Sequence, residues 1–241
     1  MKIPKKISPD SIKTSVIEVR YNSALPLEVL IGLFYRALDD NYTYSAWGLP
    51  VSGGQSKNNL TLNFPQNHIF FTDKITLTLH PKKFVFNCLK DYHGWDVYRK
   101  EIENTFKQLS PIKEIESYSR IGVRYVSEYP NTDLRDCVKF SFTFGMPEVK
   151  SDVYTFHSEF IMDGHKLILN LNSKVPIIQQ SESKATIVPM STIDIDVIKE
   201  GLMVNNVDDL LKEIDAVHMK EKEIFFKLLK EDFLTTLKPE Y

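Results

Sequence analysis

The segment VYTFHSEFIMDGHKLILNLN, residues 153–172, decides the fold because it predicts a β-hairpin. Asp163-Gly164 favours a two-residue type I′ turn, and apolar and polar residues alternate on both sides of it. Counting outward from the turn predicts three cross-strand pairs: Met162 with His165, Phe160 with Leu167, and Phe156 with Leu171. The C-terminal part of the chain is therefore expected to contain antiparallel strands.

Hydrophobic periodicity assigns the other elements. Strands are expected over 15–21, 74–89 (two strands joined at His80–Lys83) and 115–129, with a further one near 60–71. Helices are expected over 25–40 and 94–110. A strand over 185–198 should break or bulge at Pro189, and a helix over about 206–237 should follow it. The stretch 41–59, which holds the only Gly-Gly pair, reads as a polar loop.

These elements predict an α+β protein with mainly antiparallel strands in one or two twisted sheets. Three principal helices, including the long C-terminal one, are expected to pack on one side. Residues 1–130 form an N-terminal β-α-β-β-α-β half. Residues 131–241 form a C-terminal half of antiparallel hairpin and terminal helix, and we expect the two halves to make one compact unit.

Composition excludes several classes of protein. Of 241 residues, 42% are hydrophobic, which is enough for a core and argues against disorder. The 30 basic and 32 acidic residues nearly cancel and provide no global field for DNA or an anionic membrane. Cys88 and Cys137 lack the spacing of a zinc or redox motif, and no apolar run could span a bilayer. Because the N-terminal residues also lack the apolar core of a secretory signal, we expect a cytoplasmic protein without a membrane partner.

Two aspartates, Asp194 and Asp196, alternate with apolar residues and so share one face of a strand. Two carboxylates on one face are suitable ligands for a divalent metal, with Glu159 as the third acid. Alternatively, they lie on the solvated face of an antiparallel sheet, which shows the same alternation.

The arginines offer a third interpretation of these aspartates. Arg120 and Arg124 flank Gly122 on one strand face, and Arg20 shares a face with Glu18. Guanidinium groups placed in this way match a phosphate or carboxylate ligand. They match equally well a ladder of ion pairs with Asp194, Asp196 and Glu18 across neighbouring strands, and we favour the ladder.

Other chemical groups give weaker signals. His218 lies on the apolar stripe of the last helix, either as a general base or as a hydrogen-bonded core residue. None of the six histidines is in a metal motif, and no nucleotide or nucleophile motif occurs, so we expect neither a metal site nor a cofactor. Nucleic acid has modest support as a partner. Four N-terminal lysines and three aromatic residues of the 41–59 loop favour it: Lys2, Lys5, Lys6, Lys13, Tyr42, Tyr44 and Trp47.

Five short motifs occur in order along the chain: VIEVRY, GW, RIGVRY, IDIDV and AVHMKEKEIFFKLL. Together they resemble a sporadically distributed family of uncharacterised bacterial proteins of about this length. The matching positions are Glu18, Arg20, Trp95, Arg120, Arg124, Asp194, Asp196, His218 and Phe225. The resemblance implies a bacterial cytoplasmic protein of patchy inheritance, as in mobile, phage-defence or toxin–antitoxin systems, and it brings no established enzymatic activity with it.

Two hypotheses for the function follow. The first is a non-catalytic binding or regulatory protein of a bacterial accessory system, which acts through a protein partner or a second copy of itself. The second is an enzyme or ligand-binding domain directed at phosphate, nucleotide or nucleic acid, with Arg20, Arg120, Arg124, Asp194, Asp196, Glu159 and His218 as its candidate residues. A concave pocket of unpaired arginines and acids would favour the second hypothesis, whereas a paired ladder and an exposed apolar surface would favour the first.

Overall fold

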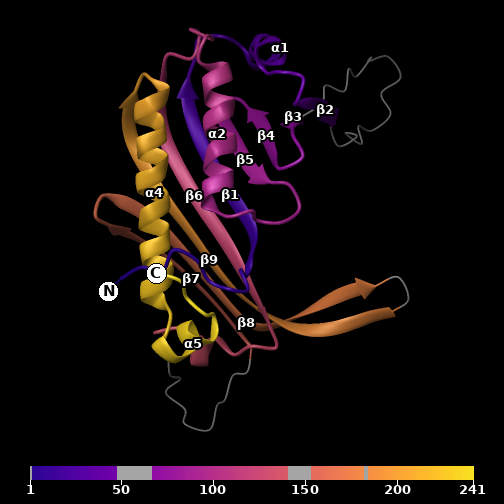
Figure 1. Ribbon diagram of the computed structural model, residues 1–241, viewed down its shortest axis with the longest axis vertical. Helices are drawn as coiled ribbons and strands as arrows, with labels where there is room; N and C mark the ends of the chain where they lie inside the picture. The colour runs from indigo at the N-terminus through magenta and orange to yellow at the C-terminus, as the bar shows by residue number, and fades with distance from the viewer. Residues whose placement is uncertain (1, 48–66, 141–152, 182–183) are drawn as a thin grey trace, which may run out of the picture. The chain divides into compact units, whose positions relative to one another are not determined.

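The computed structural model describes residues 2–47, 67–140, 153–181 and 184–241 (Figure 1). The helices are α1 (Leu27–Ala37), α2 (Trp95–Leu109), α3 (Leu134–Cys137), α4 (Val207–Leu228) and α5 (Glu231–Thr236). The strands are β1 (Ile12–Asn22), β2 (Thr43–Trp47), β3 (Asn67–Phe71), β4 (Ile75–His80), β5 (Lys83–Cys88), β6 (Ser117–Pro130), β7 (Tyr154–Met162), β8 (His165–Ser181) and β9 (Lys184–Val204).

These strands form one nine-stranded antiparallel sheet in the order β2-β3-β4-β5-β1-β6-β9-β8-β7. The predicted α+β class is therefore confirmed. The chain divides into two compact units: unit 1 is Met1–Ser15, Ile121–Glu200 and Lys212–Tyr241, and unit 2 is Val16–Arg120 and Gly201–Leu211. The halves predicted from the sequence, 1–130 and 131–241, are continuous segments, whereas each of these units is assembled from separate segments.

Aromatic side chains form the core of unit 2. Phe84 of β5 lies 5.4 Å from Phe34 of α1 and 6.0 Å from Phe106 of α2, measured between ring centroids. Phe86, two residues further along β5, also contacts Phe106. Because alternate residues of a strand share a face, both helices pack on the same face of β5.

The hairpin predicted over 74–89 is confirmed, with His80 opposite Lys83 at its turn. The predicted loop over 41–59 is wrong in its first part, because residues 43–47 form β2, which pairs with β3. Residues 41 and 42 connect α1 to β2, and residues 48–59 lie outside the described ranges. The predicted strand near 60–71 corresponds to β3 in its described part. Gly94, which precedes α2, has a φ of 87°, a left-handed conformation that favours glycine.

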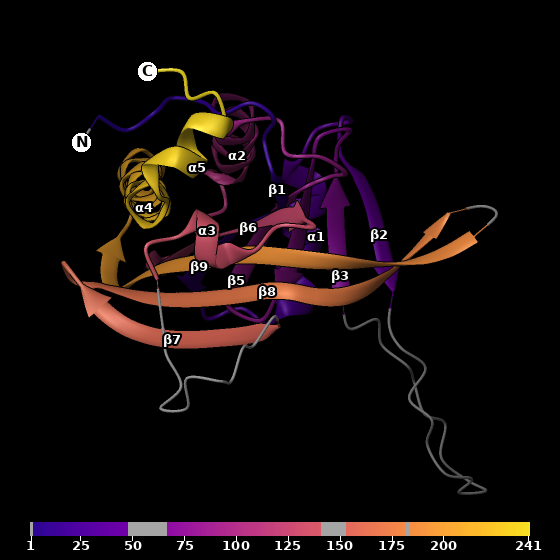
Figure 2. The same ribbon diagram turned by 90° about the horizontal axis from the view of Figure 1, so that it is seen from below.

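The hairpin of β7 and β8 in unit 1 has the predicted register. Met162 pairs with His165, Phe160 with Leu167, and Phe156 with Leu171. Asp163 and Gly164 have φ angles of 49° and 76°, as a type I′ turn requires. Figure 2 shows α4 and α5 on one side of β7, β8 and β9.

The predicted bulge at Pro189 is misplaced. The register shift lies in the partner strand β8, between Asn172 and Val175, where Lys174 has a φ of 53°. Pro189 stays in the ladder, directly opposite Pro176. Proline is tolerated there because it lies where β9 runs past the end of β6, whose next residue, Asn131, donates its N–H to the Pro189 carbonyl.

The helix expected over 206–237 corresponds to α4, which ends at Leu228, and to the shorter α5. Between them the chain is extended, and Leu229 forms a β-bridge with Val138. The N–H of Lys230 donates to the Cys137 carbonyl, and the N–H of Lys139 donates to the Leu228 carbonyl. These hydrogen bonds replace the next helical turn.

Candidate functional site

Arg124 and Asp194 form an ion pair across neighbouring strands of unit 1. Arg124 Nε donates to Asp194 Oδ1 at 2.8 Å and its Nη2 donates to Oδ2 at 2.9 Å. Asn170 of β8 donates to the same Oδ2 at 3.0 Å and contacts His157 Nδ1 of β7 at 2.6 Å. Hydrogen bonding to Asp194 raises the pKa of Arg124, and the charge of Asp196 adds to this effect. A continuous polar row thus crosses four strands.

The three acids considered as metal ligands are not brought together. In the register of the sheet, Ile168 lies opposite both Glu159 and Asp196 and so separates them by two strand spacings, roughly 10 Å. Glu159 pairs instead with Lys166 at 2.7 Å. Within the described ranges, no three histidine, cysteine or acidic side chains are placed to hold a metal ion.

His218 belongs to a different environment from these acids. Its Nδ1 lies 3.2 Å from the hydroxyl of Tyr125, which follows Arg124 on β6. Because adjacent residues of a strand point to opposite faces, His218 lies on the helix-covered face and Arg124 on the other. Burial lowers the pKa of His218 to about 3, with a smaller contribution from Lys222, so the ring is neutral at pH 7.

In unit 2, three cationic side chains surround Glu18 of β1. Arg20 Nε and Lys83 Nζ each lie 3.0 Å from its carboxylate, and Arg120 also forms an ion pair with it. Burial alone would raise the pKa of Glu18, but the Lys83 hydrogen bond and the Arg120 and Arg20 interactions outweigh it, so this pKa is lowered. Arg20 and Lys83 share this one carboxylate, and Arg20 is half exposed to solvent.

Strands β8 and β9 continue as a two-stranded arm, which we define as residues 175–179 and 185–190 (Figure 1). Pairing with β7 ends at Ser173, and β6 ends at Pro130. Within the described ranges the two strands of the arm pair with each other, and at its base Pro189 also accepts the N–H of Asn131. No residue of the arm is charged. Ile178 and Ile187 lie directly opposite each other and are 73% and 71% exposed.

The two isoleucines belong to one apolar surface. Pro176 and Pro189 face each other one step along the same face, and Ala185 lies beyond Ile187; all three are exposed. Pro176 and Pro189 have no N–H groups to exchange, so they form a non-hydrogen-bonded pair. Because the two kinds of pair alternate along an antiparallel ladder, Ile178 and Ile187, two residues further on, also form a non-hydrogen-bonded pair. In such pairs the side chains approach closely, and the isoleucines therefore form a single patch.

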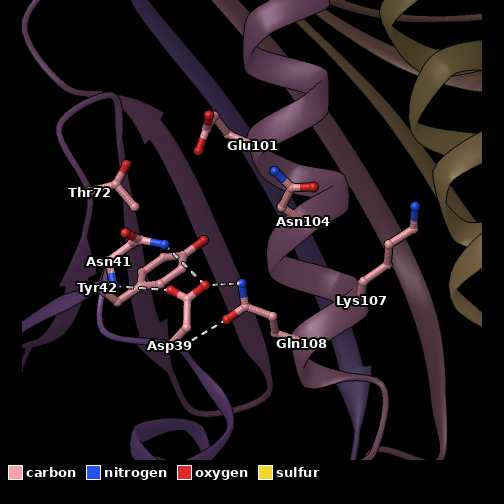
Figure 3. A pocket seen from close by; sticks show the side chains of 8 residues that line it. All are labelled: Asp39, Asn41, Tyr42, Thr72, Glu101, Asn104, Lys107 and Gln108. Atoms are coloured by element: carbon pink, nitrogen blue, oxygen red, sulfur yellow. Dashed lines mark hydrogen bonds between the residues drawn. The ribbon is translucent and has the colours of Figure 1, made fainter.

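Unit 2 also contains a polar cleft of about 320 Å³ between α2, the α1–β2 connection and the β3–β4 turn (Figure 3). Gln108 of α2 holds Asp39 of the connection twice, through its side-chain amide at 3.0 Å and by accepting the Asp39 N–H at 2.8 Å. The hydroxyl of Tyr42 lies 2.6 Å from that of Thr105. Burial raises the pKa of Tyr42, and the charges of Glu101 and Asp39 raise it further.

Neither the arm nor the cleft is among the sites predicted from the sequence. A sequence signal for the arm does exist. It is the uncharged run VPIIQ, residues 175–179, together with a second proline, Pro189, which precedes Asp194 on the next strand. The cleft has no local signal, because Asp39 and Gln108 are 69 residues apart. Tyr42 and Tyr44, considered for stacking on bases, instead bond to Thr105 and His68.

No protein-family model matches this sequence, and no curated protein matches it either. The resemblance to a bacterial family therefore stays a prediction. Among the described residues, no helix combines the length and the apolar character that crossing a membrane requires.

Proposed function

We propose that this protein is a non-catalytic binding or regulatory protein that acts through a protein partner in the bacterial cytoplasm. The setting would be an accessory system such as phage defence or toxin–antitoxin control. The arm is the observation that carries the proposal. Full burial of an isoleucine side chain contributes roughly 1.5–3 kcal/mol. Because Ile178 and Ile187 are exposed, a partner that buried them would gain this free energy on binding.

The chemistry of the partner follows from the arm. Because none of its residues is charged, we expect an apolar groove without charged residues at its centre. The isoleucine pair would act as the anchor, and contacts around it would exclude water. A standard interface buries about 800 Å² per partner, so we expect the groove to contact both faces of the arm.

The polar row in unit 1 supports the same proposal. Arg124 and Asp194 satisfy each other, and the candidate acids are separated in the sheet. The pairing accounts for these residues without a ligand or a reaction. The proposal includes the prediction that the principal helices pack on one side of the sheet. That arrangement would leave the polar row on the uncovered side.

Site-specific photocross-linking in cells tests the proposal. A benzophenone amino acid at position 178 should give one discrete adduct, and the second-site change Ile187→Ser should abolish it. Position 161 is the matched control, because Ile161 is equally exposed at 73% but lies on β7. Equal adducts from both positions, or none from 178, would reject the arm as the contact. An adduct of twice the protein's mass would identify a second copy as the partner.

The Glu18 cluster favours a second candidate function, the binding of an anionic ligand such as phosphate or nucleic acid. Arg20 and Lys83 share the carboxylate of Glu18, so their two positive charges exceed its single negative charge. Fluorescence anisotropy with labelled oligonucleotides at low salt tests it. Binding should weaken in Arg20→Ala and Lys83→Ala but not in Lys227→Ala, whose lysine is exposed on α4. Absence of binding by the wild type would eliminate this candidate.

A further inference from the structure

The polar cleft of unit 2 is held in shape before any ligand binds. The Asp39 carboxylate accepts from Gln108 Nε2 at 3.0 Å and from the Asn41 side chain and backbone at 3.2 and 3.1 Å. On the other wall, Thr105 donates to the Glu101 carbonyl within α2 and bonds to Tyr42. Preorganised side chains of this kind lose little conformational entropy on binding.

The charged groups that line the cleft already have partners. Lys74 Nζ lies 2.9 Å from Glu101 Oε1, and Lys107 is paired with Glu103, one turn earlier on α2. The Asp39 carboxylate accepts from three neutral N–H donors. An anionic ligand would have to displace Glu103 from Lys107, whereas a neutral ligand would disturb no ion pair.

The remaining hydrogen-bonding groups include both a donor and acceptors. Asn104 is exposed on α2 and faces the cleft in Figure 3. Its side-chain amide makes no hydrogen bond with the described residues and supplies both a donor and an acceptor. Glu101 pairs with Lys74 through Oε1, which leaves Oε2 as an acceptor, and Asn41 keeps its side-chain carbonyl. A hydroxyl group is both donor and acceptor, so neighbouring hydroxyls match such a lining.

We propose that this cleft binds a neutral polyhydroxylated small molecule, a monosaccharide or a cyclitol. Its volume of about 320 Å³ is at the lower end for small-molecule sites. The lining is polar, and its aromatic member is Tyr42, so hydroxyl recognition by carboxylate and amide groups dominates. The inference is independent of the arm, which belongs to the other unit.

Nuclear magnetic resonance titration of the full chain tests the proposal. The probes are glucose, galactose, ribose and myo-inositol, each added up to tens of millimolar, and the readout is the side-chain amide signals of Asn41, Asn104 and Gln108. At least one probe should shift these signals in a saturable manner. Asn104→Ala should weaken its binding about five- to tenfold, the effect of one or two neutral hydrogen bonds.

Two controls make the result decisive. Lys100→Ala changes an exposed residue of the same helix outside the cleft, so it should leave binding unchanged. Putrescine and arginine test the alternative that the carboxylates select a cation. The proposal is overturned if no hydroxylated probe moves the three amide signals, if the cationic probes move them more strongly, or if Asn104→Ala binds as wild type does. None of these results bears on cross-linking through the arm.

Discussion

A double-mutant cycle on Arg124 and Asp194 tests whether the polar row stabilises the sheet. The carboxylate accepts two hydrogen bonds from Arg124, at 2.8 and 2.9 Å, and one from Asn170 at 3.0 Å. The Asp194 side chain is 9% exposed, whereas that of Arg124 is 46% exposed. The pair is thus buried on one side and solvated on the other.

The magnitude follows from this asymmetry. A hydrogen bond to a charged group contributes roughly 1.5–3 kcal/mol, and an exposed ion pair about 0–1 kcal/mol. Because water reaches the guanidinium but hardly reaches the carboxylate, we expect a coupling free energy of about 1–2 kcal/mol. Asp194→Ala alone should lower the free energy of unfolding by about 2–3 kcal/mol, because it also leaves Asn170 without its acceptor.

Urea unfolding of the wild type, Arg124→Ala, Asp194→Ala and the double variant measures this coupling, provided that the four m-values agree. The control cycle is Glu223 with Lys227, a pair one turn apart on α4 whose lysine is exposed, for which about 0.3–0.5 kcal/mol is expected. Lys220, which also contacts Glu223, is kept in all four variants. A coupling no larger than that of the control would refute the role of the row. If magnesium raised the melting temperature of the wild type but not of Asp194→Ala, the aspartate would be a metal ligand.

Three further predictions concern single residues. Since burial lowers the pKa of His218 to about 3, the unfolded state binds its proton more readily, and stability should fall by up to about 1.4 kcal/mol per pH unit below pH 6.5. His218→Gln should flatten this slope, measured as urea midpoints from pH 7.5 to 5. Gly164→Ala should destabilise the protein by about 1 kcal/mol, because φ is 76° at this position. Gly32→Ala, inside α1 with free space around it, should stabilise the protein by about 0.5–1 kcal/mol. Thermal unfolding of the two variants measures both changes. Tyr42→Phe should lower the free energy of unfolding by about 0.5–1.5 kcal/mol in urea, through loss of its bond to Thr105.

Local chemistry accounts for the parts of the fold that the sequence predicts. Asp163-Gly164 specifies its turn without help from the rest of the chain, and the turn then fixes the register of β7 and β8. The pairing of Arg124 with Asp194 was also among the interpretations, because residues of opposite charge on neighbouring strands attract. Which strands become neighbours was not predictable, since that depends on contacts between distant segments.

Glu221 shows where hydrophobic periodicity fails to predict which side of a helix is buried. It stands between Lys220 and Lys222 in the sequence, which indicates a solvated helix face, yet the residue is only 5% exposed. Burial raises its pKa well above the usual value for glutamate, with the charge of Lys222 opposing. The buried side of α4 is wider than its apolar stripe, and only the packing of the whole unit determines that width. The arm depends in the same way on where β6 and β7 end.

The opposed prolines have a consequence for the behaviour of the free protein. In a non-hydrogen-bonded pair the backbone nitrogens of Pro176 and Pro189 point outward, to the two edges of the arm, and neither carries a hydrogen. A strand from another molecule that tried to extend the ladder would find a missing donor on each edge. The missing donors therefore disfavour cross-β pairing along this uncharged, apolar ribbon, and the partner proposed above would recognise the ribbon by its side chains.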